Sequence, residues 1–296
     1  MTPAHREDFL LRAMPMVFVV IWSTGFIVAR YGMPHAPPFK FLALRYALSI
    51  LCFLAWMSFA GSRWPTSGKQ ILHLVVTGVL MHACYLGGVW AAVKAGMGSG
   101  VSALVVGLQP VLTAVWLSSA GAQVSKRQWI GLTLGFAGLV VVVSPKFGQG
   151  NPADHIDLVS LSLAVAALLS ITVGTLYQKR YVAGCDVRTA SVVQLGAALA
   201  VTLPLALLEM ESMRWNAELS GAMAWSVLVL TVGGSSLLYL LIQRGAATSV
   251  TSLFYLVPPC TALMAWLLFS EPVTLPTVAG TVLTALGVGL VVRANR

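Results

Sequence analysis

The chain has 296 residues, of which 58% are hydrophobic and only 9% carry a charge. A soluble protein has about 25% charged residues, so the composition excludes a water-soluble globule and indicates a polytopic protein embedded in a lipid bilayer. The net charge of +9 is common among nucleic-acid-binding proteins. Here, however, the basic residues lie singly or in pairs between apolar runs, so no nucleic-acid partner is expected.

Ten apolar segments follow one another along the chain. A helix needs about 20 apolar residues to cross the hydrocarbon core of a membrane, and backbone groups cannot stay unpaired in lipid, so these segments are expected to be helices. The predicted fold is an all-α membrane protein with ten transmembrane helices and short links. The segments span roughly residues 14–30, 38–60, 70–94, 98–120, 127–144, 157–179, 187–209, 219–243, 247–269 and 273–292.

The distribution of lysine and arginine predicts the orientation in the membrane. If alternate links are placed on the same side, twelve of the eighteen basic residues lie on the side that holds both termini. Cytoplasmic links carry an excess of lysine and arginine, so both termini are predicted to be cytoplasmic. Adding or removing one span would destroy this bias, which therefore also favours ten spans.

The second half of the chain repeats the first at an offset of 149 residues. Residues 96–143 align without a gap on residues 245–292, and each copy is a pair of apolar segments whose first member contains a proline. Such self-similarity indicates duplication. Five spans per half, at residues 1–148 and 149–296, force the second half to enter the membrane from the opposite side. The prediction is two inverted repeats around a central cavity.

Several short stretches carry a resemblance to a known family. They are WSTGF at residues 22–26, LRY at 44–46, GLQPVLTAVW at 107–116, LVPPCTALMAW at 256–266 and SEP at 270–272. Together with the glycine-spaced last span of each half, they make the chain resemble the drug/metabolite transporter superfamily, in its ten-helix EamA-type branch. The resemblance implies export or exchange of small organic solutes, such as amino acids, aromatic ones among them, across a bacterial inner membrane. One departure is Ala122, which stands where the second half has Glu271.

The prolines of the repeated segments are candidate hinges. Pro110, Pro258 and Pro259 fall within apolar segments, where a proline removes a hydrogen bond. They either kink the helix statically for packing or form hinges beside the cavity. Gln109 either lines the cavity or bonds the carbonyl freed by its neighbour.

The third span concentrates polar and aromatic residues. His82 lies at mid-span, where an ionisable residue is a functional candidate, and Tyr85 is on the same helical face. His82 is either neutral and hydrogen-bonded to a neighbouring helix, part of the substrate path, or a proton carrier. Trp90 and Lys94 follow one turn apart and either bind a zwitterion with an apolar side chain or belong to an interfacial belt. Their second-half counterparts are Tyr239 and Gln243.

Further candidates lie in other spans. Trp22, Ser23 and Thr24 in the first span are cavity candidates, although serine and threonine often bond their own helix backbone. Arg45 either extends towards the outer surface or faces the interior as the counter-charge of a carboxylate. Tyr177 and Tyr255 are further aromatic candidates. Small residues on the last span of each half, Gly131, Gly135, Gly138, Gly280, Thr284 and Gly287, predict close internal packing or a dimer contact.

The absences in the sequence also limit the function. The chain has no Walker A sequence, no H-E-x-x-H or G-x-S-x-G motif, and no paired cysteines, so neither a cofactor nor a metal is expected. Every acidic residue lies outside the middle of the spans, which disfavours coupling by a membrane carboxylate. The predicted protein is not an enzyme but an exporter working by alternating access, as a monomer or homodimer. A membrane enzyme acting on lipid and a channel or scaffold are the alternatives.

Overall fold

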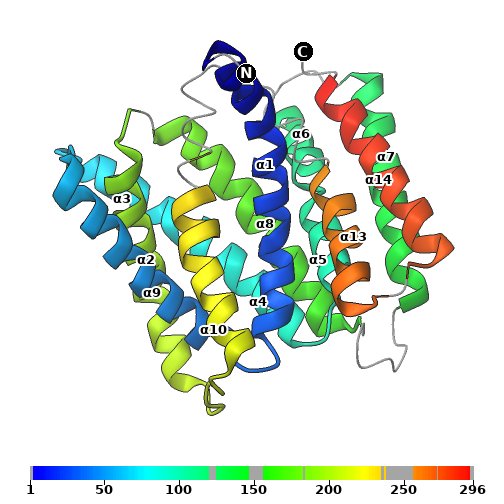
Figure 1. Cartoon of the computed structure of the whole chain (residues 1–296). Coiled ribbons are helices and arrows are strands. Elements are labelled where there is room, and N and C mark those ends of the chain that lie inside the picture. Colours follow the sequence, from blue (N-terminus) through cyan, green and yellow to red (C-terminus); the bar gives the residue numbers. More distant parts are fainter. Residues whose placement is uncertain are drawn as a thin grey trace.

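The computed structural model describes residues 3–119, 125–146, 156–182, 184–234, 237, 256–271 and 273–293. Within these ranges every element is a helix, and the helices stand side by side as one bundle (Figure 1). The N-terminal end of α1 and the C-terminal end of α14 lie at the same end of the bundle, at the top of the view. The predicted boundary between the halves, at residues 148 and 149, falls outside the described residues.

The first half of the described chain ends at Lys146. Its helices are α1 (Pro3–Gly32), α2 (Pro38–Ala60), α3 (Gly68–Gly78), the π-helix η1 (Val79–Cys84), α4 (Tyr85–Lys94), α5 (Ser99–Val106), α6 (Gln109–Ser119), α7 (Lys126–Val143) and the 3-10 turn η2 (Ser144–Lys146). The second half contains α8 (Leu158–Tyr181), α9 (Val187–Leu208), α10 (Ala217–Ala224), the π-helix η3 (Trp225–Gly233), α13 (Val257–Phe269) and α14 (Leu275–Arg293).

The lengths of these helices match a membrane. In the described part of the chain, five helical stretches are long and apolar enough to cross a bilayer, and five further apolar helices are shorter. Each of these helices overlaps one of the ten segments predicted from the sequence, although the ends differ. The prediction of an all-α membrane protein is confirmed.

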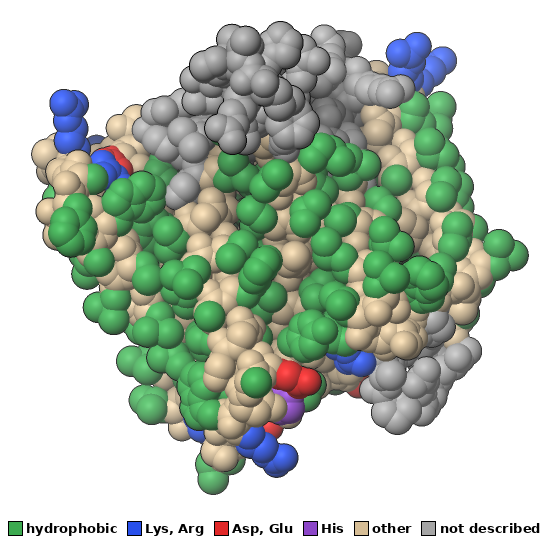
Figure 2. All heavy atoms as spheres, in the orientation of Figure 1, with side chains coloured by type: hydrophobic (Ala, Val, Ile, Leu, Met, Phe, Trp, Pro, Cys, Tyr) green, Lys and Arg blue, Asp and Glu red, His purple; other side chains and the backbone are tan. Residues whose placement is uncertain are grey.

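The outer surface of the bundle is apolar. Phe59 is 91% exposed, and Leu207 and Leu275 are exposed to a similar degree. Figure 2 shows apolar side chains over the body of the visible face, with the charged side chains in view gathered towards its two ends. In water such a surface would associate, whereas in lipid it is the normal exterior of a spanning helix.

Helices α7 and α14 cross at a seam of small residues. A Cβ atom added at Gly287 would lie 2.5 Å from the carbonyl oxygen of Gly131, and one added at Gly138 would lie 2.5 Å from that of Gly280. Residue numbers therefore increase along α14 as they decrease along α7, which means that the two helices are antiparallel. The 149-residue shift exchanges these two contacts, as a pseudo-two-fold axis between oppositely oriented halves requires. The predicted small-residue faces therefore pack against each other inside one chain.

Each half also contains a π-helical segment. Residues 79–84 of η1 correspond, at the 149-residue shift, to residues 228–233 of η3. A π-turn inserts one extra residue and is often found at functional sites. The sequence does not predict these π-helical segments, because one extra residue per turn does not disturb an apolar run that has no polar face.

The carboxylate of Glu271 caps the first turn of α5. This side chain is 8% exposed, and its Oε1 atom accepts hydrogen bonds from the backbone N–H of Ser99, at 3.1 Å, and from the Ser99 hydroxyl, at 2.9 Å. The N-terminus of a helix carries unpaired N–H groups and favours a negative charge. Glu271 therefore ties the end of α13 to the start of α5.

Replacing Glu271 by alanine is expected to destabilise the bundle by about 2 kcal/mol, the usual cost of losing a charged hydrogen-bonding partner of a buried group. Thermal melting in detergent would measure this. Glu218→Ala is the matched control, because that carboxylate is 59% exposed and an exposed pair contributes at most about 1 kcal/mol. Equal melting of the two variants would contradict the capping role.

Candidate functional site

A buried arginine lies in the interior of the bundle. Arg45 is the eighth residue of α2 and is only 7% exposed. Its Nε and Nη2 atoms both donate to the hydroxyl of Thr231 in η3, each at 3.2 Å. The guanidinium carbon lies 5.9 Å from the centre of the Trp90 ring. Arg45 therefore faces the protein interior and does not extend to the outer surface.

The geometry of η3 prepares Thr231 for this contact. Its hydroxyl donates to the carbonyl oxygen of Ser226, five residues earlier, at 2.8 Å. A hydroxyl has one donor and two acceptor lone pairs, so with the proton given to the backbone, the lone pairs are available to the guanidinium. The i−5 spacing is that of a π-turn.

The second half supplies a matching pair. The 149-residue shift sends Arg45 to Gln194 in α9 and Thr231 to His82 in η1. The Gln194 side chain lies near the His82 side chain. The bundle thus contains one pair between α2 and η3 and a second between α9 and η1, and the repeat exchanges them. The difference between the pairs is charge, because only Arg45 is a permanent cation.

Aromatic side chains surround these pairs. Tyr46 is fully buried and donates its hydroxyl to the carbonyl oxygen of His82, at 2.8 Å. Trp90 is 1% exposed and stacks on Phe41, with 4.4 Å between ring centres. Tyr85 is also buried and close enough to Arg45 to interact with its charge. We refer to Arg45, Tyr46, His82, Tyr85, Trp90, Gln194 and Thr231 as the polar centre.

The carboxylates of the described side chains all lie at helix ends and have other partners. Glu209 accepts from the backbone N–H groups of Phe39 and Lys40. The hydrogen bonds that the Arg188 guanidinium donates to Asp186 hold the pKa of that carboxyl below its ordinary value. The remaining pairs are Asp157 with Ser160, Glu211 with Lys94, Glu218 with His35 and Glu271 with Ser99. Among these residues, therefore, no carboxylate pairs with Arg45.

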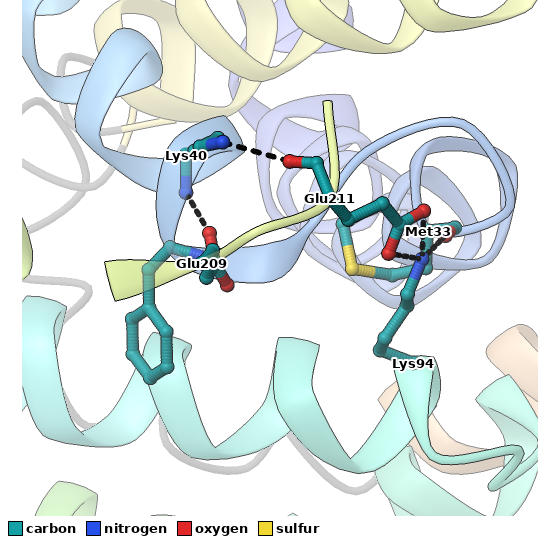
Figure 3. A network of polar contacts seen from close by, with 6 residues as sticks. Met33, Lys40, Lys94, Glu209 and Glu211 are labelled. Atoms are coloured by element: carbon teal, nitrogen blue, oxygen red, sulfur yellow. Dashed lines mark hydrogen bonds and ion pairs between the residues drawn. The ribbon is translucent and has the colours of Figure 1, made fainter. Parts of the chain in front are cut away.

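Lys94 lies at one end of the bundle, outside the polar centre. Its Nζ atom donates to the carbonyl oxygen of Met33, at 2.9 Å, and forms an ion pair with Glu211, at 2.8 Å. Lys40 donates to the carbonyl oxygen of the same Glu211, at 2.7 Å. Figure 3 shows the two lysines reaching towards Glu211 from different helices. In this conformation the Lys94 ammonium is already engaged, and its role in binding substrate stays a prediction.

The first-span candidates bond to helix backbones. Ser23 is fully buried and donates to the carbonyl oxygen of Val19, at 2.7 Å. Thr24 donates to that of Ile21, at 2.6 Å, and accepts from the indole N–H of Trp225, at 2.9 Å. Trp22 is partly buried beside Phe18, with 5.3 Å between ring centres. The contact with Trp225 joins α1 to η3, whereas the other contacts lie within α1.

The candidate hinge prolines stand at helix starts. Pro110 is the second residue of α6, and α5 has ended at Val106, so the helix is broken between them. Pro258 and Pro259 occupy the first turn of α13. A proline is tolerated there because its missing N–H would be unpaired in any case. A Cβ at Gly107 would lie 2.8 Å from Cγ of Pro258, so the two interrupted segments touch.

The remaining candidates are dispersed. Gln109 donates its amide to the hydroxyl of Thr175, at 2.9 Å, and so links α6 to α8. The Tyr177 hydroxyl lies 2.7 Å from Nδ1 of His73, away from the polar centre. Tyr239, Gln243 and Tyr255 fall outside the described residues. The structure thus brings His82, Tyr85 and Trp90 together.

Sequence reasoning passed over three members of the polar centre. Tyr46, Gln194 and Thr231 were not selected, and Arg45 was left open between two roles. The signal was available, since the 149-residue shift relates Arg45 to Gln194 and His82 to Thr231. Only the fold, however, shows that each pair forms across the two halves.

The helices, their apolar exterior and the buried polar centre define a polytopic α-helical membrane protein with a polar interior. A model of the EamA-like transporter family matches residues 13–144 and again residues 158–293. The chain belongs to the EamA-like transporter family.

Curated relatives carry transporter names. "Uncharacterized inner membrane transporter YedA" of Escherichia coli K12 is 25% identical over 211 residues, which is 71% of this chain and only 66% of that protein. "Uncharacterized transporter YvbV" of Bacillus subtilis is 25% identical over 98% of this chain and 92% of its own length. A "Probable amino-acid metabolite efflux pump" of Salmonella typhimurium is 24% identical over 60% of this chain and 54% of its own length.

A solved crystal structure shares the fold. It superposes with a TM-score of 0.66 over 95% of both chains, at 17% sequence identity. At this identity the likeness concerns the fold alone.

Proposed function

We propose that the protein is a secondary transporter that exports small organic solutes, with amino acids and related metabolites as the cargo class, across the bacterial inner membrane. The observation that carries the proposal is the polar centre of this EamA-like transporter, to which both halves contribute residues. A transporter of inverted repeats binds its substrate at the interface of the repeats near mid-membrane. The relative named as a probable amino-acid metabolite efflux pump supports the cargo class.

Alternating access requires that each end of the bundle can close. Three ion pairs or charged hydrogen bonds join the halves at one end: Lys94 with Glu211, His35 with Glu218, and the start of α2 with Glu209. Figure 3 shows the first and the third of them. We name these contacts the end lock. The end lock lies on the side predicted to be external, so the described conformation is closed to the outside in this proposal.

Transport needs no covalent chemistry. The substrate shifts the population between the two states by binding them with different affinity, and the lock and the polar centre are the elements that respond. Every polar group of the centre is suited to hydrogen bonding, and substrate release follows when the lock opens.

Counterflow in proteoliposomes tests the proposal. Vesicles preloaded with an unlabelled solute are expected to accumulate the same labelled solute transiently, for at least one member of an amino-acid and metabolite panel. Protein-free vesicles serve as the control. A channel would instead equilibrate the label without overshoot, and a protein that moves no member of the panel would contradict the proposal.

A further inference from the structure

The guanidinium of Arg45 is buried with most of its hydrogen-bonding capacity unused. Arginine has five N–H donors in a rigid fork and stays charged. In the described structure Nε and Nη2 share one acceptor, the hydroxyl of Thr231, and the donors of Nη1 reach no acceptor among the described residues. The side chain is nevertheless more than nine-tenths buried.

Among the residues that the structure describes, this cation has no anionic partner. The described carboxylates are all engaged at helix ends, and residues 238–255 contain no aspartate or glutamate. Glu7 and Asp8 precede the first apolar segment, and Asp154 lies in the link between the halves. The Trp90 ring compensates the charge only in part, since a cation over an aromatic face keeps its unsatisfied donors. A buried charge without a counter-ion is costly and is normally retained for a function.

Unpaired hydroxyls next to Arg45 favour a ligand as the partner of its unused donors. Ser49, one helical turn after Arg45 on α2, and Ser226, the carbonyl partner of Thr231, are both fully buried, and their hydroxyls have no hydrogen-bond partner among the described residues. Unpaired hydroxyls thus lie both on α2, which carries Arg45, and on η3, which carries its partner Thr231. A small polar ligand bound between α2 and η3 would satisfy them together.

From this arrangement we propose that Arg45 binds the carboxylate of the transported solute. The inference rests on the proposed transport function. A carboxylate matches the guanidinium fork and can accept two parallel hydrogen bonds from it. The equivalent position in the other half is the neutral Gln194, so the polar centre holds one cation and selects one carboxylate. Trp90 and Tyr85 provide apolar surface for the remainder of a monocarboxylate.

The test compares a carboxylate substrate with its neutralised analogues. For the panel member that gives the strongest counterflow, uptake is measured for the acid, its methyl ester and its decarboxylated amine. The wild-type protein is expected to prefer the acid at least about 10-fold, because a site built to hydrogen-bond a group rejects the analogue that lacks it. Arg45→Gln is expected to abolish this preference, chiefly by slowing uptake of the acid by about 50-fold or more.

Two further variants separate binding from folding. Arg45→Lys keeps the charge but loses the fork, and it is expected to retain a reduced preference for the acid. Arg188→Gln is the matched control, because Arg188 also lies over a tryptophan ring, Trp56, at 5.8 Å, but has a carboxylate partner at the bundle end. It should leave the preference unchanged.

The outcomes distinguish this inference from the proposed function. A wild-type protein that moves no solute contradicts both. Transport without preference for the acid overturns the assignment of Arg45 alone, as does an Arg45→Gln protein that keeps the preference or loses uptake of acid and amine equally. If Arg45→Gln does not fold, the wild-type preference and its reduction in Arg45→Lys decide the question.

Discussion

Replacing Gly287 by alanine is expected to destabilise the protein by about 3 kcal/mol, although it adds only one methyl group. The new Cβ would lie 2.5 Å from both the carbonyl oxygen of Gly131 and the backbone nitrogen of Gly135. Backbone atoms cannot rotate away, so α7 and α14 must separate. Overpacking of a tight interface costs about 1–3 kcal/mol, and the loss of close helix approach in lipid adds to it.

Because of the pseudo-symmetry, a second substitution in the other half tests the same contact independently. Gly138 occupies the position equivalent to Gly287, and its added Cβ would meet the carbonyl oxygen of Gly280. Gly138→Ala should therefore destabilise the protein to a similar extent. Melting temperatures of the purified variants in detergent would measure both effects.

Gly289→Ala is the matched control for the helix seam. Gly289 lies two residues beyond Gly287 on α14, and its added Cβ would meet no atom within 4 Å. Alanine also has a higher helix propensity than glycine, by about 1 kcal/mol. This variant should melt at or above the wild-type temperature. If all three alanine variants melted together, the close approach of α7 and α14 would be wrong.

Much of the fold could be predicted because membrane helices impose strong constraints on sequence. The apolar segments had to be long enough to cross the hydrocarbon, and the repeat fixed their pairing into halves. The glycine seam was predictable as a packing face, but its partner was not. Small residues such as Gly131 and Gly287 indicate close approach without saying which helix approaches.

The candidate site was predicted less completely, for reasons that are local. His82, Tyr85 and Trp90 were selected as ionisable or aromatic residues within one span, and they do lie together. Lys94 follows the same span at helical spacing, but its flexible chain reaches Glu211 at the bundle end. The partner of Arg45 depends on a π-turn that aims the Thr231 hydroxyl inward, and apolar periodicity does not report π-turns. Whether these residues bind substrate stays a prediction.

Breaking the end lock is expected to open the external end of the bundle. Glu211→Lys removes the ion pair with Lys94 and places two ammonium groups where a salt bridge stood. The pair is partly exposed, at 29% and 38% of the two side chains, so its loss costs at most about 1 kcal/mol. Repulsion between like charges adds a similar amount, and the population open to that side should rise about 10-fold.

A cysteine at position 49 reports this opening without any substrate. Ser49 is fully buried one turn from Arg45, and serine and cysteine are close in shape. In a background without the four native cysteines, labelling of Ser49→Cys by a membrane-impermeant thiol reagent, added from the side of Glu211, should be about 10-fold faster with Glu211→Lys.

Charge exchange separates a lock from a simple loss of structure. Adding Lys94→Glu to Glu211→Lys restores an ion pair of reversed polarity, so labelling should return close to the wild-type rate. Glu218→Lys is the comparison at a more exposed contact of the same end lock, and because its carboxylate is 59% exposed, solvent screening should limit its effect to about 2-fold. If the double exchange labelled as fast as Glu211→Lys alone, the ion pair would not hold the external end closed. The hydrogen bond from Lys94 to the carbonyl oxygen of Met33, which Lys94→Glu also removes, would then be the contact that holds it closed.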